Sequence, residues 1–176
     1  MKFKKLLAVV GSVVVAGSIL AACSETTVEK KESGSKTEET ASDSKSETTE
    51  DKTFKVGDTV SVNDVDITIT KAEFTSPEQY TPAEKGKVLT LEVTAKNGSS
   101  EQQFVDNTDF AVYDENGVKV EDYYGYDQMA ISDNINKGRQ LNGKLYYDVP
   151  EQGSYELVYT PSFSWDGKEV KWNIEL

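Results

Sequence analysis

Apolar and polar residues alternate with a period of two along most of residues 53–176. Val65, Ile67 and Ile69, for example, are each followed by a polar residue. This period is typical of β-strands with one packed face and one solvated face, and it favours antiparallel sheets. The clearest alternating runs lie at residues 65–70, 89–95, 145–149, 155–159 and 170–174.

Turn-forming residues separate these runs. Asn97-Gly98, Asn116-Gly117 and Asp166-Gly167 suit the positive φ angles of tight hairpin turns. Helix signals are few, and residues 77–85, which contain two prolines, predict a loop. We expect seven to nine short strands. Because each sheet has one apolar face to cover, the pattern predicts an all-β fold, a two-sheet antiparallel β-sandwich.

Several strand-and-turn stretches of residues 54–160 match a known family in order and spacing. The domain resembles the telokin-like, immunoglobulin-like domain of unknown function found in bacterial lipoproteins and small secreted proteins. This resemblance implies an immunoglobulin-like sandwich outside the cell, with a signal or lipid at the N-terminus, and it supplies no catalytic residue. The matching stretches are FKVGDTV at 54–60, GKVLTLEVTAKN at 86–97, Phe110 with DENG at 114–117, and GKLYYDVP at 143–150.

The first 22 residues have the pattern of a secretory signal peptide. A positively charged start precedes an apolar run over 6–20, which is short for a spanning helix of about 20 apolar residues. The run ends in Leu20-Ala21-Ala22-Cys23, which resembles the lipobox of bacterial lipoproteins. We therefore expect diacylglyceryl and palmitate chains on Cys23, and a protein anchored to the extracellular face of a Gram-positive-type cell membrane. An ordinary signal peptide with a chance cysteine is the alternative.

Residues 23–52 are predicted to be a lipidated cysteine followed by a disordered linker. From residue 24 to residue 52 only Val28 and Ala41 are apolar. Such a segment cannot bury enough apolar surface to offset the entropy of ordering it. The three predicted parts of the chain are thus the signal peptide at 1–22, the linker at 23–52 and the immunoglobulin-like domain at 53–176.

Composition excludes several classes of function. The chain has no histidine and one cysteine, which removes Ser-His-Asp and Cys-His catalysis, histidine-bearing zinc sites and internal disulfides. Its formal net charge is −12, with no basic stretch outside the first residues, so we expect no nucleic-acid partner. We predict a non-enzymatic protein without a cofactor, because abundant carboxylates alone do not specify glycosidase chemistry.

Aromatic residues supply the candidate interaction surface. Tyr123, Tyr124 and Tyr126 surround Gly125 next to acidic residues, and Trp165 stands in a turn. Tyrosine offers a large amphipathic contact area at low entropic cost, which suits a sugar or a protein partner. The simpler interpretation is a strand whose alternate tyrosines pack in the core.

Acidic loop residues supply the weaker calcium candidates Asp106, Asp109 and Asp114. Calcium takes six to eight oxygen ligands, but no segment has the spacing of an EF-hand. Solvated turn residues are the simpler interpretation, and we expect no other metal.

Two functions remain open from the sequence. The first is a non-catalytic, membrane-anchored module that interacts with an envelope protein or a cell-wall component. The second is a binding module for a small ligand or calcium, acting as a receptor or transport accessory. A pocket at one loop end of the sandwich would favour the second.

Overall fold

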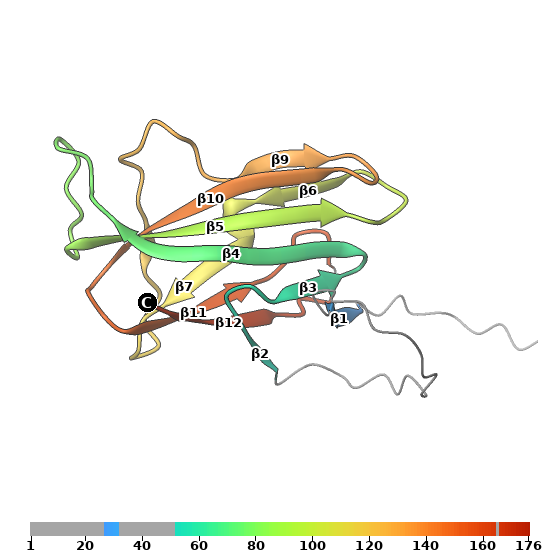
Figure 1. The fold of residues 1–176 in the computed structure, drawn as a ribbon, viewed down its shortest axis with the longest axis horizontal. Coiled ribbons are helices and arrows are strands. Elements are labelled where there is room, and N and C mark those ends of the chain that lie inside the picture. Colours follow the sequence, from blue (N-terminus) through green and yellow to red (C-terminus); the bar gives the residue numbers. More distant parts are fainter. Residues whose placement is uncertain (1–26, 32–51, 165) are drawn as a thin grey trace, which may run out of the picture.

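The computed structural model describes residues 27–31, 52–164 and 166–176. Their main layer is a sheet of six strands, in the spatial order β1-β3-β4-β5-β10-β8, and all of its pairs are antiparallel. The two central pairs, β4 with β5 and β5 with β10, run nearly the full length of the domain (Figure 1). The strands of this sheet are β1 Val28–Lys31, β3 Thr59–Val62, β4 Val65–Thr75, β5 Lys87–Asn97, β8 Glu121–Asp122 and β10 Gln140–Val149.

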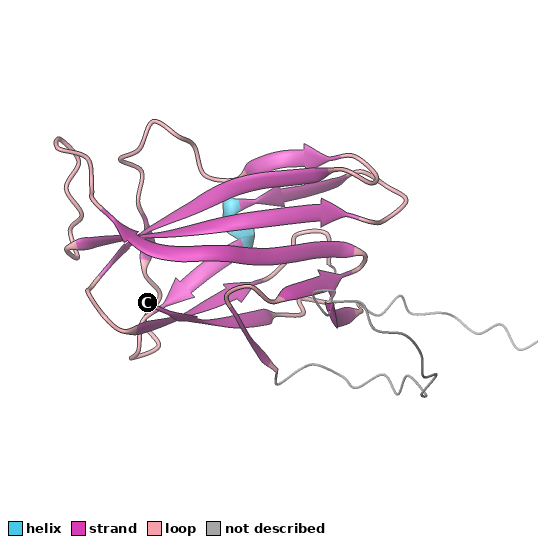
Figure 2. Cartoon of the chain, in the orientation of Figure 1, coloured by secondary structure: helices cyan, strands magenta, loops and turns pink. Residues whose placement is uncertain are grey.

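A second sheet of four strands, in the order β2-β12-β11-β7, covers one face of the first. It differs from a fully antiparallel arrangement in one pair, because β2 runs parallel to β12. A two-stranded antiparallel sheet, β6-β9, and a 3-10 turn, η1 Asn107–Asp109, complete the described fold (Figure 2). The remaining strands are β2 Thr53–Lys55, β6 Gln103–Asp106, β7 Phe110–Tyr113, β9 Ser132–Ile135, β11 Ser154–Tyr159 and β12 Val170–Glu175.

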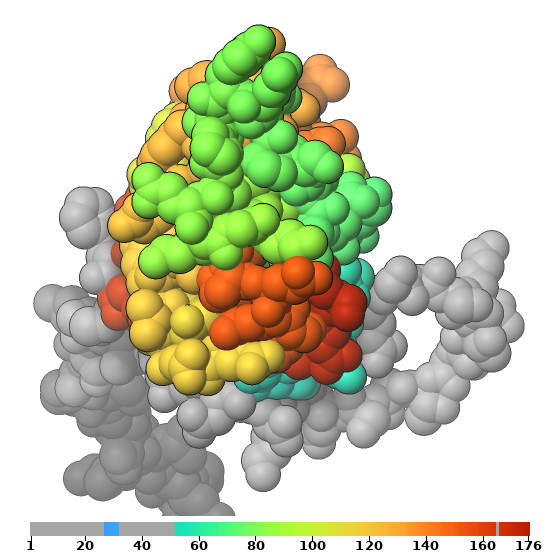
Figure 3. Space-filling view, turned by 90° about the vertical axis from the view of Figure 1, so that its left-hand side faces the viewer, coloured from blue at the N-terminus to red at the C-terminus, as the bar shows by residue number. Residues whose placement is uncertain are grey.

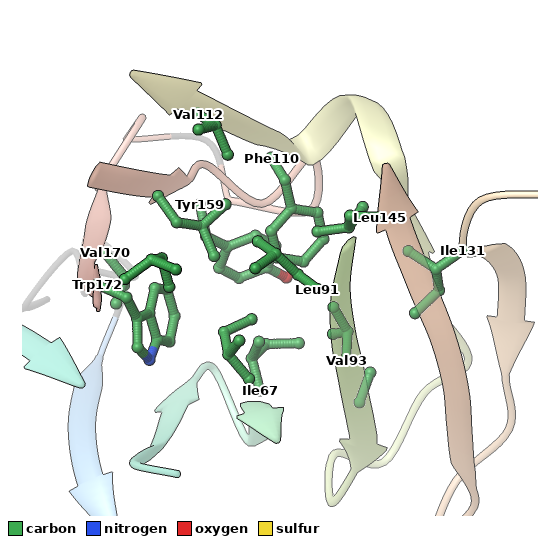
Figure 4. Close-up of a cluster of buried hydrophobic side chains, with 14 of the residues drawn as sticks. Ile67, Leu91, Val93, Phe110, Val112, Ile131, Leu145, Tyr159, Val170 and Trp172 are labelled. Atoms are coloured by element: carbon green, nitrogen blue, oxygen red, sulfur yellow. The ribbon is translucent and has the colours of Figure 1, made fainter. Parts of the chain in front are cut away.

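Alternation explains the core between the sheets. The inward-facing residues Ile67, Leu91 and Leu145 of the large sheet are fully buried, as are Val112 and Trp172 of the second sheet. Figure 4 shows these side chains meeting in one cluster. This confirms the all-β sandwich predicted from the two-residue period.

Strict alternation predicts that the other face of the large sheet is in contact with solvent. Part of this face is buried instead. Thr90, Tyr146 and Asp148 point away from the core, yet they are only 2–8% exposed. Val88, Tyr123 and Tyr146 form a second apolar cluster there. The loops at this end of the sandwich fold over the sheet and bury residues that would otherwise be wet.

Strand β1 corrects one sequence-based expectation. Residues 28–31 belong to the predicted disordered linker, but the structure pairs them with β3. Val28 packs against the core, and the Lys30 and Lys31 ammonium groups lie 2.7 Å from carboxylate oxygens of Asp58 and Asp66. The open edge of β3 thus supplies what an isolated polar segment lacks. The predicted signal peptide, Cys23 and residues 32–51 lie outside the described residues.

Candidate functional site

Two of the predicted tyrosines hold two loops together at one end of the sandwich. The Tyr123 hydroxyl donates to the Thr81 carbonyl at 2.6 Å and accepts from the Glu78 amide at 2.7 Å. The Tyr126 hydroxyl donates to the Ser76 carbonyl at 2.7 Å. The loop of residues 123–130 is therefore fastened to the loop of residues 76–86. Figure 3 looks onto this end, where the green 76–86 loop crosses the top of the molecule.

Further contacts fix the same arrangement. The Asp148 carboxylate accepts from the backbone amides of Glu84 and Lys85 at 2.5 and 2.8 Å. Tyr126 packs edge-on against Tyr123 and Tyr146, with ring centroids 5.0 and 4.9 Å away. These aromatic and hydrogen-bonded contacts make the 76–86 loop a built part of the domain rather than a loose connection.

Gly125 is required for this packing. A Cβ atom on Gly125 would overlap the ring and hydroxyl of Tyr123, lying 2.7 Å from its Cε1 atom. The Tyr123 ring can pack against the backbone of Gly125 only because residue 125 has no side chain. In the sequence Tyr-Tyr-Gly-Tyr the first tyrosine is thus buried, the second is exposed and the third is partly buried.

The loop leaves a pocket at the edge of β10. The Tyr123 amide donates to the Tyr146 carbonyl, and the Ile131 amide donates to the Lys144 carbonyl, both at 2.9 Å. Between these two hydrogen bonds, residues 124–130 arch away from the strand. We call the resulting cavity of about 400 Å³ the tyrosine pocket; its walls are Asn107, Asp122, Tyr123, Tyr124, Tyr126, Gln128, Met129, Ala130, Ser132, Leu145, Tyr146 and Tyr147.

Exposed apolar side chains surround this pocket. Tyr124 is 81% exposed and Met129 is 84% exposed, and both line it. Tyr80, on the neighbouring 76–86 loop, is 91% exposed but is not part of the lining. Large apolar side chains that the fold leaves in water next to a cavity are typical of a binding surface.

One carboxylate organises the polar side of the pocket. Asp122 accepts hydrogen bonds from the Tyr124 hydroxyl at 3.0 Å and from the Asn107 amide at 3.2 Å. The bond to Asp122 raises the pKa of Tyr124, so its hydroxyl stays a donor. Burial, and then the charge of Asp122, raise the pKa of Tyr147, whose hydroxyl has no hydrogen-bond partner among the described residues.

The structure thus brings together Tyr123, Tyr124 and Tyr126, and Trp165 lies outside the described residues. Sequence reasoning missed the contributions of Asn107, Met129 and Tyr147 to the same pocket. Met129 carried a usable signal, because it is a large apolar residue that follows Asp127 and Gln128 in a loop. Asn107 and Tyr147 carried none, because only the tertiary fold brings η1 and β10 beside this loop.

The three acidic calcium candidates occupy structural positions. Asp106 and Asp109 form a reciprocal capping box around η1, and Asp109 also accepts from the Ser162 amide at 3.1 Å. Burial raises the pKa of Asp109. Asp114 caps its own turn through the amides of Asn116 and Val118. Over residues 27–31, 52–164 and 166–176, no three acidic, histidine or cysteine side chains gather to hold a metal ion.

Fold and site together define a class: an immunoglobulin-like β-sandwich module with a tyrosine-lined pocket at one loop end. The chain belongs to the family described as domain of unknown function DUF4352, whose profile matches residues 54–170. This confirms the family resemblance carried by the strand-and-turn stretches. In the described part of the chain, no helix is long and apolar enough to cross a membrane.

A lipoprotein of Bacillus subtilis is similar to this chain in sequence and in structure. The chain is 27% identical over 119 residues to the uncharacterized lipoprotein YcdA of strain 168, covering 60% of this chain and 34% of that protein. The crystal structure of YcdA superposes with a TM-score of 0.56 over 64% of this chain and 37% of that chain. The chain therefore spans about a third of that relative's length.

The YjhA protein of the same species shares the fold. It superposes with a TM-score of 0.55 at 20% identity, covering 70% of this chain and 98% of that one. Neither relative is described by name as an enzyme.

Proposed function

We propose that this protein is a lipid-anchored, non-catalytic recognition module on the extracellular face of a Gram-positive-type cell membrane. Diacylglyceryl and palmitate chains on Cys23 anchor it, since two or more acyl chains give stable attachment where one does not. The tyrosine pocket and its exposed rim bind an envelope protein or a cell-wall component. The lipobox-like sequence and the relationship to the lipoprotein YcdA support the anchor.

The observation that carries the proposal is the placement of the pocket relative to the N-terminal strand. The Thr27 amide donates to the Asn63 side chain at 3.0 Å, beside the first residue of β4. Tyr126 is hydrogen-bonded to Thr75, the last residue of β4, at 2.7 Å. Figure 1 shows β1 and the loops of the pocket at opposite ends of the domain.

This separation gives the molecule a direction. An eleven-residue strand is about 33 Å long at ~3.3 Å per residue. Three residues separate Cys23 from Thr27, so a lipid on Cys23 holds the β1 end near the membrane. The tyrosine pocket then faces outward into the cell-wall space, where an envelope partner is within reach.

The test is photo-crosslinking in living cells from two exposed positions of the full chain. A crosslinking amino acid at Tyr124 should form envelope adducts, whereas one at Lys137, in the turn at the β1 end, should not. Cys23→Ala should release the protein from the membrane and remove its lipid in mass spectra. Equal adducts from both positions, or none from Tyr124, would contradict recognition by the pocket; membrane retention of Cys23→Ala would contradict the anchor.

A small-ligand receptor is the second candidate, because the pocket lies at a loop end and is not filled by side chains. Its volume of about 400 Å³ is within the ~300–1,000 Å³ range of ligand pockets.

A further inference from the structure

We infer that the tyrosine pocket binds a neutral saccharide, in particular an oligomer of N-acetylated hexosamine units. This inference rests on the proposed function, which it deepens by naming the chemical class that the pocket takes. Each unit of such a saccharide is apolar on one face and carries hydroxyl and amide groups at its edge, so a pocket that binds it must offer both apolar and polar contacts. The residues of the pocket supply both kinds of contact.

The apolar contact comes from Tyr124. The residue is 81% exposed, and the hydrogen bond from its hydroxyl to Asp122 limits how the ring can turn. A flat, oriented aromatic ring offers a surface for the C–H face of a pyranose, and it is nearly in place before binding. Met129 adds an adaptable apolar side chain on the same rim.

The polar contacts suit hydroxyl and acetamido groups. Asp122 is an acceptor for sugar hydroxyls, while the Asn107 and Gln128 amides each offer both a donor and an acceptor. Ser132 adds a hydroxyl to the lining.

The lining argues against charged ligands. It contains no lysine or arginine, and Asp122 would repel a phosphate or carboxylate. A quaternary ammonium ligand needs several free ring faces around it. Here Tyr123, Tyr126 and Tyr146 pack edge-to-face at 4.9–5.0 Å, so their faces are largely used by one another.

A neighbouring hollow favours an oligomer over a single sugar. A second pocket of about 400 Å³ shares Tyr126, Gln128 and Tyr146 with the first. Its lining carries the charged side chains of Glu78, Asp127 and Lys144, so it is not basic on balance either. A chain of two or more sugar units can therefore run from one pocket into the next along the outer face of the large sheet.

The experiment titrates the full chain, purified in detergent, with the N-acetylglucosamine tetramer and measures heat and intrinsic tyrosine fluorescence. Cellotetraose, which lacks the acetamido groups, and a tetramethylammonium salt are the comparison probes. Saturable binding of the N-acetylated tetramer, stronger than that of cellotetraose, is expected. Tyr124→Ala should weaken it by about tenfold or more, because it removes the aromatic ring on which the sugar packs.

Tyr80→Ala is the matched control, because it removes another highly exposed tyrosine that is outside the pocket lining, and it should leave binding unchanged. No saturable binding, equal weakening by Tyr80→Ala, or preference for tetramethylammonium would overturn the inference. The proposed function fails separately, through the cellular crosslinks: adducts from Tyr124 without tetramer binding would leave recognition intact and make the partner a protein.

Discussion

At the scale of single residues, two buried tyrosines show how the fold treats polar atoms unequally. The Tyr155 hydroxyl donates to the Pro150 carbonyl and accepts from the Gln152 amide, so it fastens the turn before β11 to the sheet. This backward bond resembles the tyrosine corner of immunoglobulin-like sandwiches. Tyr159 stacks on Phe110 at 4.6 Å, but its hydroxyl has no partner among the described residues.

The same substitution at these two tyrosines should have opposite effects. Tyr155→Phe should lower the free energy of unfolding by about 1–2 kcal/mol, because it removes two hydrogen bonds and leaves the Gln152 amide unpaired. Tyr159→Phe keeps the stacked ring and removes only an unpaired buried hydroxyl, so stability should stay the same or rise by up to ~1 kcal/mol. Urea unfolding of the full chain measures both; equal losses would contradict this account of the core.

At the scale of elements, β1 is held at the sheet edge by ionic as well as backbone contacts. The hydrogen bond from Lys30 lowers the pKa of Asp58. A carboxyl group whose pKa is lower when folded stabilises the folded form above its unfolded pKa, and that contribution disappears as the pH falls through the folded pKa. For Asp58 this stabilising contribution is therefore lost at pH values below 3.8, the ordinary pKa of an aspartate side chain.

Docking of β1 should therefore weaken at acid pH. Amide hydrogen-exchange protection of residues 28–31, corrected for intrinsic rates, should fall as the pH drops below about 3.8. Lys30→Ala should lower this protection at neutral pH and remove most of its acid dependence; the effect is small, since an exposed ion pair contributes under about 1 kcal/mol. Glu29→Gln, on the same strand, is the control, and an unchanged acid dependence in Lys30→Ala would refute the ionic contribution.

Strands could be predicted from the sequence better than the elements that cover them. The alternation at residues 65–70 and 145–149 predicted β4 and β10, because a two-residue period depends only on neighbouring residues. Strand β1 could not be predicted, because its stability comes from Asp58, Asp66 and the edge of β3 rather than from its own composition.

The candidate site shows the same limit. Its tyrosines could be found in the sequence as a local cluster, and the large amphipathic surface of tyrosine indicated a binding site. Which of them is buried depends on the 76–86 loop, about 45 residues away in sequence, whose backbone pairs with the Tyr123 hydroxyl. Likewise, the alternating pattern predicts that Asp148 faces solvent. It is buried instead, because the backbone amides of Glu84 and Lys85 donate hydrogen bonds to its carboxylate.

At the scale of the whole molecule, charge and topology act together. Without the three lysines of the predicted signal peptide, the domain and linker carry 31 acidic residues against 16 basic ones. In the proposed anchored protein, this excess should keep the domain from lying flat on an anionic lipid surface. With the N-terminal strand at one end of β4 and the tyrosine pocket at the other, an anchored molecule should stand with the pocket away from the membrane.

The most direct measurement is the distance of each end from the lipid surface. In the proposed lipoprotein the thiol of Cys23, the one cysteine of the chain, is consumed by the lipid, so Y124C and K137C variants can each be labelled at a single site. In vesicles with an acceptor dye in the headgroups, energy transfer should place position 124 farther from the membrane than position 137 by on the order of 20 Å or more. Equal distances, or position 124 closer to the lipid, would contradict an outward-facing recognition site.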